Sequence, residues 1–366
     1  MKEIIWRGGM IGAGAWSHDQ LNAWAGVNNA RIIALTDRHP ERRDPIVEQF
    51  SIPLAYDNFE TMLAQADLDF VDICTQPYSH VRLCEFAAEK GLPILCQKPF
   101  CKSLEEAEKV VDYCRERGVR LMVNENFRWQ AWHRTIKDIL NSGELGDVFF
   151  AGMHQRHRLT QPEFDHSQSY FADMPRLLLC EVGTHLLDVA RYLFGEPQTV
   201  YCRLHKISPE VRGEDVQVIT LAYPEMTLVI HDSWASVPIP GLDRSEQVFT
   251  WYPRLLEIDG RRGTLKHYPD GQIKLFTDSG VKSWAAPQGA MPAAYRTAQQ
   301  HFVDCLERGE EFETSGAETL KTMALVYACY QSAAAGQSVP PRRSEPVHII
   351  GHKNRSAIAT YQGIIQ

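Results

Sequence analysis

The fold is decided by the segment Ile4-Ile5-Trp6-Arg7-Gly8-Gly9-Met10-Ile11-Gly12-Ala13-Gly14-Ala15-Trp16-Ser17, where an apolar run ends in closely spaced glycines. A Gly-x-Gly-x-x-Ser loop between a strand and a helix is a variant of the dinucleotide-binding fingerprint. Gly12 permits a tight turn, Gly14 lets the backbone approach a pyrophosphate, and the helix that begins near Ser17 directs amide groups at the phosphates. The loop residues predicted to bind a dinucleotide are Gly12, Gly14, Ala15 and Trp16.

The second apolar run, Arg31 to Thr36, ends at Asp37, which follows Gly14 by 23 positions. An acidic residue at this place hydrogen-bonds the ribose hydroxyls of a bound dinucleotide. Its carboxylate repels a 2′-phosphate, whereas Arg38 beside it would attract one. We therefore predict NAD as the cofactor, with NADP as the alternative. Ser17 and Gln20 have the spacing of a capping box at the start of the first helix.

The first 125 residues alternate short apolar runs with amphipathic stretches, which predicts strand-helix-strand units around a doubly wound parallel sheet. The expected strands are 4–11, 31–36, 53–56, 70–74, 93–96 and 119–123. The expected helices are 17–25, 40–50, 59–66, 79–90 and 103–117. We assign residues 1–125 to a Rossmann dinucleotide-binding domain.

From about residue 146 the chain shows longer alternating runs without helices between them, which predicts an α+β domain with a large, mainly antiparallel open sheet. The expected strands are 147–157, 199–206, 216–222, 227–235, 254–259, 264–267 and 272–277, and the expected helices are 177–194, 294–308 and 317–335. We assign 126–345 to substrate binding and oligomerisation and 346–366 to a C-terminal arm. An uncovered sheet face favours a homodimer or homotetramer.

The composition excludes several classes of protein. The chain has 366 residues, 44 % of them hydrophobic and 23 % charged, as in soluble globular proteins. A net charge of −8 without a basic run argues against a nucleic-acid partner. The sequence lacks a signal peptide and an apolar run long enough to cross a membrane. Its nine scattered cysteines are typical of a reduced, cytoplasmic protein.

Two polar loops follow the fourth and fifth expected strands. Gln97-Lys98-Pro99 ends the fifth strand, and the carboxyl ends of such strands face the ligand. Lys98 is therefore predicted to lie beside the cofactor and a substrate hydroxyl; the alternative is a surface lysine flanking a helix. Thr75, Gln76, Pro77 and His80 follow the fourth strand and are predicted to lie along the cofactor. His80 alternatively packs on its own helix.

The expected helix 177–194 places Glu181, His185 and Asp188 on one face, because they are four and three positions apart. An imidazole with carboxylates beside it is a plausible proton acceptor. The alternative is structural, with Asp188 paired to Arg191 and Glu181 in solvent.

Basic residues cluster in His154-Gln155-Arg156-His157-Arg158, which raises the question of a metal site. Neighbouring arginines repel a cation, and His154 and His157 point to opposite faces of a strand. We therefore predict no metal. We assign Arg156, His157 and Arg158 to binding a carbohydrate substrate. The forked guanidinium group of arginine matches anionic groups, so an arginine-lined pocket would favour an acidic substrate.

Taken in order, these motifs resemble the Gfo/Idh/MocA oxidoreductases over about residues 4–335. The resemblance rests on the loop 12–17, Asp37, the run 74–80, Gln97-Lys98-Pro99, the run 124–129, and Glu181-x-x-x-His185-x-x-Asp188. The family pairs a Rossmann domain with a C-terminal domain built on an open sheet. The resemblance adds Asn126 to the cofactor-binding residues and Arg128 to the substrate-binding residues.

The resemblance implies hydride transfer between NAD(P) and a secondary alcohol of a sugar, sugar acid or polyol. Lys98 matches the family's catalytic lysine and His185 the histidine paired with it. We expect His185, supported by Glu181, to accept the alcohol proton while Lys98 polarises the oxygen; the reverse assignment is the alternative. The sequence departs from the family at two of these positions. Gln97 stands where the family usually has Glu, and Glu181 stands where many polyol dehydrogenases of the family have Asp. Two other functions remain open, an NAD-dependent redox-neutral glycoside hydrolase and a non-catalytic ligand sensor.

Overall fold

The computed structural model describes residues 5–156, 158, 169–237, 255–285 and 290–341. It divides into two compact units. Unit 1 comprises Met1–Ala131 and Gly289–Lys321, and unit 2 comprises Trp132–Gln288 and Thr322–Gln366. Within the described residues no helix is long and apolar enough to cross a membrane.

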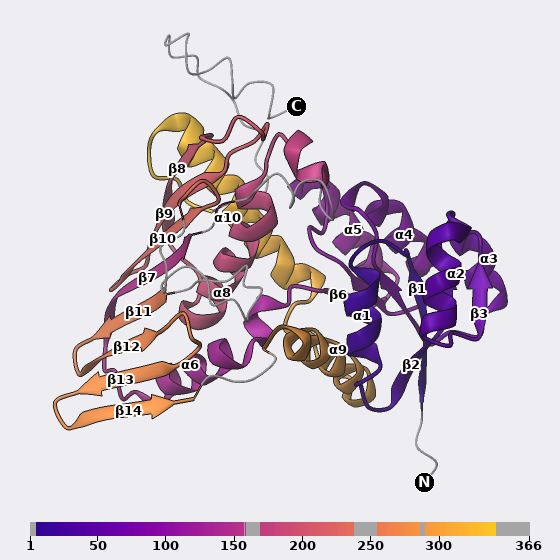
Figure 1. Cartoon of the computed structure of the whole chain (residues 1–366), viewed down its shortest axis with the longest axis horizontal. Coiled ribbons are helices and arrows are strands. Elements are labelled where there is room, and N and C mark those ends of the chain that lie inside the picture. The colour runs from indigo at the N-terminus through magenta and orange to yellow at the C-terminus, as the bar shows by residue number, and fades with distance from the viewer. Residues whose placement is uncertain (1–4, 157, 159–168, 238–254, 286–289, 342–366) are drawn as a thin grey trace. The chain divides into compact units, whose positions relative to one another are not determined.

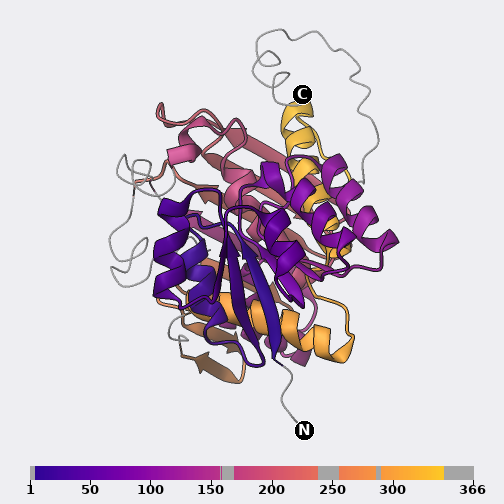
Figure 2. The same ribbon diagram turned by 90° about the vertical axis from the view of Figure 1, so that its right-hand side faces the viewer.

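Unit 1 contains a six-stranded parallel sheet in the order β3-β2-β1-β4-β5-β6 (Figure 1). The strands are β1 (Trp6–Ile11), β2 (Ala30–Thr36), β3 (Leu54–Tyr56), β4 (Phe70–Ile73), β5 (Ile94–Cys96) and β6 (Leu121–Val123). The helices of this unit are α1 (Ser17–Trp24), α2 (Pro40–Gln49), α3 (Phe59–Gln65), α4 (Pro77–Glu89), α5 (Leu104–Glu116) and α9 (Ala290–Arg308). Figure 2 shows the strands between helices. This confirms the predicted doubly wound sheet, whose order reverses between β1 and β4.

Helix α9 belongs to unit 1, although the sequence pattern placed it in a contiguous second domain over 126–345. Its residues Ala294, Ala298 and Phe302 recur every four positions and are fully buried. They join one core cluster with Trp24 of α1 and Phe70 of β4. The apolar stripe was visible in the sequence, but the surface that covers it is distant in the chain.

Unit 2 contains an eight-stranded mixed sheet in the order β14-β13-β12-β11-β7-β10-β9-β8. The strands are β7 (Val148–Arg156), β8 (Thr199–His205), β9 (Val216–Ala222), β10 (Thr227–Ser233), β11 (Leu255–Gly260), β12 (Gly263–His267), β13 (Ile273–Thr277) and β14 (Gly280–Trp284). Among the described strand pairs of this eight-stranded sheet, only β7–β10 is parallel, and the others are antiparallel. The predicted large, mainly antiparallel sheet is confirmed, and β14 is an addition to it.

Three further helices accompany this sheet: α6 (Ala131–Ser142), α8 (Thr184–Phe194) and α10 (Gly316–Ala335), whose first residues lie in unit 1. Figure 1 shows α6, α8 and α10 on one side of the strands. Burial alternates accordingly, with Leu228 and Ile230 of β10 fully buried and Val229 and His231 half-buried. We call the covered face the inner face and the other the outer face. Helix α6 was not predicted.

The expected single helix 177–194 is interrupted. A π-helical turn, Leu179–Gly183, precedes α8. A π-turn contains one more residue per turn than an α-helix and is frequent at functional sites. Eight of the eleven residues of α8 are buried, and they lie on every side of the helix.

His267 of β12 is a buried histidine on the inner face, only 4 % exposed. Its ring stacks on Trp132 of α6 with centroids 5.4 Å apart. Neither ring nitrogen has a hydrogen-bond partner within the described part of the chain. Burial disfavours the charged ring and lowers the pKa of His267 to about 4.

Replacing His267 by Phe is expected to remove part of the acid lability of unit 2 while keeping the stacked ring. The unfolded state takes up a proton as pH falls below 6.5, whereas the folded ring stays neutral down to about pH 4. The wild-type protein therefore loses about 3 kcal/mol of unfolding free energy across this interval. Urea unfolding at several pH values measures this loss. An exposed control, His205→Phe, should retain the loss, and an equal loss in His267→Phe would contradict the assignment.

Candidate functional site

The loop after β1 is fixed by a close backbone approach. Gly12 has a φ of +109°, and a Cβ at this position would lie 2.3 Å from the carbonyl oxygen of Cys74. The Gly12 amide also donates to the Thr36 carbonyl oxygen over 2.8 Å. The loop therefore touches the ends of β2 and β4 at once, and only glycine fits there.

The residues of this edge fit a dinucleotide. A Cβ at Gly14 would meet no described atom within 4 Å, so the backbone there is open to a phosphate group. The Asp37 carboxylate, just beyond β2, accepts hydrogen bonds from the Ala13 amide at 2.8 Å and the His39 amide at 2.9 Å. These bonds hold the carboxylate beside the glycine loop, where a ribose is expected. Arg38 is exposed, and its Nε lies 3.1 Å from His39 Nε2.

The predicted capping box is wrong. The Ser17 hydroxyl donates to the Gly14 carbonyl oxygen, and α1 has no side-chain cap. The Gln20 side chain is buried instead, with its Nε2 3.2 Å from a carboxylate oxygen of Asp72 and its Oε1 accepting from Asn124 over 3.0 Å. Burial raises the pKa of Asp72 to about 7, which its hydrogen bonds from Trp24 and Gln20 oppose.

Lys98 follows β5 at the same edge of the sheet. It is half-buried and precedes a cis peptide bond to Pro99. The Gln97 side chain turns back, so that its Oε1 accepts from the Lys98 amide over 2.9 Å. Gln97 therefore supports the backbone of Lys98 through a side-chain oxygen. A Glu at position 97, which the resemblance implies as the usual residue, would offer the same oxygen.

His80 connects the loops after β4 and β5. Its Nδ1 lies 2.8 Å from the Phe100 carbonyl oxygen and its Nε2 lies 3.0 Å from the Thr75 carbonyl oxygen. The ring is fully buried, and this burial lowers the pKa of His80, although the two carbonyl contacts oppose the shift. We call the edge of the parallel sheet where the loops after β1, β4 and β5 lie the cofactor edge. We infer that His80 is a positioning residue, which acts on this edge through the backbones of Thr75 and Phe100.

The other cofactor candidates of unit 1 lie on surrounding elements. The Trp16 ring packs edge-on against Tyr295 of α9, with centroids 6.4 Å apart. The buried Asn126 hydrogen-bonds to the Tyr295 hydroxyl. Thr75 Oγ1 lies 2.7 Å from Ser79 Oγ, while Gln76 and Pro77 begin α4. Arg128 is buried in a 3-10 turn, Phe127–Trp129, and donates to the Glu313 carbonyl oxygen over 3.0 Å.

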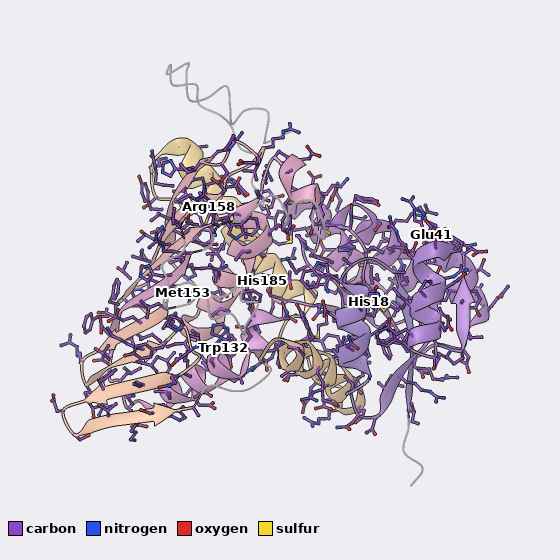
Figure 3. All side chains as sticks on the ribbon, in the orientation of Figure 1. His18, Glu41, Trp132, Met153, Arg158 and His185 are labelled. Carbon is purple, nitrogen blue, oxygen red and sulfur yellow. The ribbon has the colours of Figure 1, made fainter. Side chains whose placement is uncertain are left out.

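In unit 2, Glu181 lies in the π-helical turn. His185, which is labelled in Figure 3, lies in the first turn of α8. Both side chains are buried, at 5 % and 4 % exposure, so Glu181 is not solvated as the structural alternative required. Thr322 of α10 contacts both members of the expected Asp188–Arg191 pair. The Thr322 hydroxyl donates to Asp188 over 3.1 Å and accepts from Arg191 over 2.7 Å, and Arg191 forms an ion pair with Glu196.

The basic cluster is divided between the two faces of β7. Gln155 lies on the inner face, whereas His154 and Arg156 lie beside His231 on the outer face. Arg156 therefore points away from the face that the helices cover, and its assignment to substrate binding stays a prediction. Arg158 is exposed, and its backbone forms an isolated antiparallel β-bridge with Ala235. His157 lies outside the described residues. No cluster of three or more metal-ligating side chains occurs in the described ranges.

Sequence reasoning missed Glu214, which precedes β9. One of its carboxylate oxygens accepts from the Leu177 amide at 3.1 Å, the Leu179 amide at 3.2 Å and the Tyr330 hydroxyl at 2.6 Å. Glu214 thus binds the start of the π-helical turn. Burial raises its pKa, which the hydrogen bonds oppose. The available sequence signal was an acidic pair, Glu214-Asp215, immediately before an apolar strand.

Comparison with known proteins agrees with this geometry. A family model described as "Oxidoreductase family, NAD-binding Rossmann fold" matches residues 6–125, and the "GFO/IDH/MocA C-terminal domain" model matches residues 133–266. The chain belongs to the Gfo/Idh/MocA family. It is an oxidoreductase with an NAD-binding Rossmann domain, as the resemblance of the motifs implied.

Two D-apiose dehydrogenases are among its relatives. That of Rhizobium rhizogenes is 34 % identical over 348 residues, covering 91 % of this chain and 96 % of the relative. That of Paraburkholderia graminis is 35 % identical, covering 91 % and 89 %. A similar solved structure is an oxidoreductase from Agrobacterium radiobacter in complex with NAD⁺, L-tartaric acid and magnesium. It has a TM-score of 0.84 and 34 % identity, covering 92 % of this chain and 98 % of that one.

Replacing His80 by Leu is expected to weaken NAD binding about 10-fold, because two loops of the cofactor edge lose their common anchor and two carbonyl groups lose a polar neighbour. Isothermal titration with NAD measures the change. Leu83→Ala, on the same helix, removes core packing without touching either loop and should leave the affinity near wild type. Unchanged affinity in His80→Leu would contradict the positioning role.

Proposed function

We propose that this protein is an NAD-dependent sugar dehydrogenase, with D-apiose as the first candidate substrate. The main support is its 34–35 % identity to two D-apiose dehydrogenases over 91 % of the chain. Relatives named xylose and inositol dehydrogenases, at 26 % and 24 % identity, favour the same substrate class. The tartaric acid complex named above makes a small hydroxy acid the second candidate.

The cofactor is assigned to the carboxyl edge of the parallel sheet in unit 1. Gly12 and Gly14 would lie along the pyrophosphate, and Asp37 would bind the ribose hydroxyls. The Asp37 carboxylate already accepts two backbone hydrogen bonds, which fix it in place. Its negative charge would repel a 2′-phosphate and therefore favours NAD over NADP. Bound NAD would supply the hydride acceptor.

The proposed chemistry assigns the protons to residues of this chain. His185 accepts the proton of the substrate hydroxyl as the carbon loses hydride, so that a carbonyl forms. Glu181, buried four residues earlier, stabilises the charged imidazole. We assign to Lys98 the role that the resemblance implies, polarisation of the substrate oxygen. These roles give a function to two of the four buried polar residues of this segment, whereas Asp188 and Arg191 hydrogen-bond to Thr322.

A substrate panel tests this proposal. Purified protein is incubated with NAD or NADP and D-apiose, other sugars, polyols, L-tartrate or aryl glycosides, while reduced cofactor and released aglycone are recorded. Reduction of NAD by D-apiose is the expected outcome. Aglycone release that needs NAD but accumulates no NADH would contradict a net dehydrogenase.

With the substrate identified, Lys98→Met and His185→Ala are each expected to lower kcat about 100-fold, because each removes an acid-base or polarising group. Initial rates at saturating substrate measure the loss. Lys109→Met and His205→Ala, at exposed positions, are the matched controls. Near-normal turnover in either test variant would remove that residue from the mechanism.

We also propose that the chain forms a homodimer or homotetramer through the outer face of the unit 2 sheet. Half-buried apolar side chains there include Val218 of β9 and Val229 of β10, on neighbouring strands. Sedimentation velocity is expected to show an oligomer that Val229→Arg dissociates, because the charge would be buried in the interface. Ile207→Arg, at an exposed position past β8, is the control. A monomer at micromolar concentration would contradict this assignment.

The state of the cysteines supports a cytoplasmic location as a further part of the proposal. All nine are free thiols, and eight are buried. Burial raises the pKa of most of them, Cys96 and Cys329 included, so that they stay protonated and unreactive. Such thiols are typical of proteins in a reducing compartment.

A further inference from the structure

A row of polar residues crosses the inner face of unit 2. Asp232 of β10 is in register with Gln217 of β9 and with Gln155 of β7. The two preceding inner rows of the same strands are apolar, Leu221-Leu228-Ala151 and Ile219-Ile230-Met153. We call Gln155, Gln217 and Asp232 the polar row. All three side chains are buried, at 1 %, 0 % and 0 % exposure.

The polar row is only partly hydrogen-bonded. Gln217 Nε2 donates to Asp232 Oδ2 over 2.9 Å. Four other atoms have no partner among the residues the structure describes: both amide atoms of Gln155, Gln217 Oε1 and Asp232 Oδ1. Buried polar groups are paired in native proteins, with protein atoms or with ordered water. Four such atoms in three neighbouring side chains therefore indicate a bound partner.

The partner must be small. The three side chains are too buried to receive a sugar. Burial raises the pKa of Asp232 to about 7, and no cationic side chain of the described residues is hydrogen-bonded to it. Two amides and a carboxyl offer both donors and acceptors, which suits water, a molecule that makes two to four hydrogen bonds in such sites.

The polar row lies beneath the π-helical turn. A Cβ at Gly183 would lie 2.8 Å from Gln217 Oε1 and 2.9 Å from Gln217 Nε2. Gly183 is two residues from both Glu181 and His185. Gln217 thus lies against the backbone of the turn midway between the two residues assigned to proton transfer, and Asp232 accepts a hydrogen bond from Gln217.

We propose that Gln155, Gln217 and Asp232 form a buried water-binding site that positions the π-helical turn and, through it, Glu181 and His185. The three are positioning residues, since they act on the reaction only through the backbone at Gly183. The water site itself is independent of the proposed dehydrogenase activity, whereas its effect on turnover rests on that function.

A high-resolution crystal structure tests the water site without any substrate. Density is expected 2.7–3.2 Å from at least two of the four atoms, the ordinary hydrogen-bond range. Direct pairing of Gln155 with Asp232 and no additional density would overturn the proposal. Crystals soaked in rubidium chloride distinguish water from a monovalent cation, and an anomalous peak in the row would also overturn it.

Two variants of Asp232 test the positioning role. Asp232→Leu keeps the branched shape of the side chain but replaces both carboxyl oxygens by methyl groups. Its crystal structure is expected to show the backbone of residues 181–185 displaced by more than about 0.5 Å, enough to impair a site. Asp232→Asn keeps a polar side chain and should retain the wild-type position. Ile230→Val, in the next inner row, controls for a loss of core packing. An undisplaced turn in Asp232→Leu would overturn the role.

Kinetics supply the second readout. Asp232→Leu is expected to lower kcat about 10- to 100-fold, as small misplacements of catalytic groups do, while the KM for NAD stays within about twofold. Asp232→Asn should restore most of kcat. Equal losses in both variants, or a loss matched by Ile230→Val, would overturn the positioning role. Absence of turnover in the wild type would instead count against the proposed function, leaving the crystallographic result unaffected.

Discussion

The approach of Gly12 to the carbonyl oxygen of Cys74 is the constraint on which the cofactor edge of unit 1 depends. Any Cβ at position 12 would lie 2.3 Å from that oxygen, so the turn exists only with glycine. Because the Gly12 amide also binds Thr36, one residue joins the ends of β2 and β4. The residues that follow these strand ends, Asp37 and Thr75, are thereby held on either side of the glycine loop. The chemistry of this edge follows from one backbone contact.

Elements that carry their own signal were predictable from the sequence. The parallel strands are continuous apolar runs between amphipathic helices, because both faces of such a sheet are covered. Helix α9 shows the limit of this reasoning, since its apolar stripe predicts burial but not the unit that provides it. Strand β14 (Gly280–Trp284) escaped prediction because it is an edge strand with mostly exposed residues and no alternation.

The candidate site was predictable where motifs mark strand ends and much less where polar residues interrupt apolar strands. Asp72 and Asp232 both stand inside such runs, and burial raises the pKa of each to about 7. Their surroundings differ, because Asp72 receives bonds from Trp24 and Gln20, whereas one oxygen of Asp232 has no partner among the described residues. A sequence shows the polar residue but not its partners, which come from distant elements. The contrast between a satisfied and an unsatisfied carboxyl therefore emerges only in three dimensions.

The π-helical turn shows how unit 2 holds the residues assigned to proton transfer. A helix ordinarily begins at a cap within its own sequence, but Leu178 offers no side-chain cap here. Glu214 binds the amides at the start of the turn, and Gln217, three residues later, contacts Gly183 near its end. Both ends of the turn are thus held by a single segment, which leads into β9. A shift of β9 would move Glu181 and His185 together, so the register of the sheet sets the position of the chemistry.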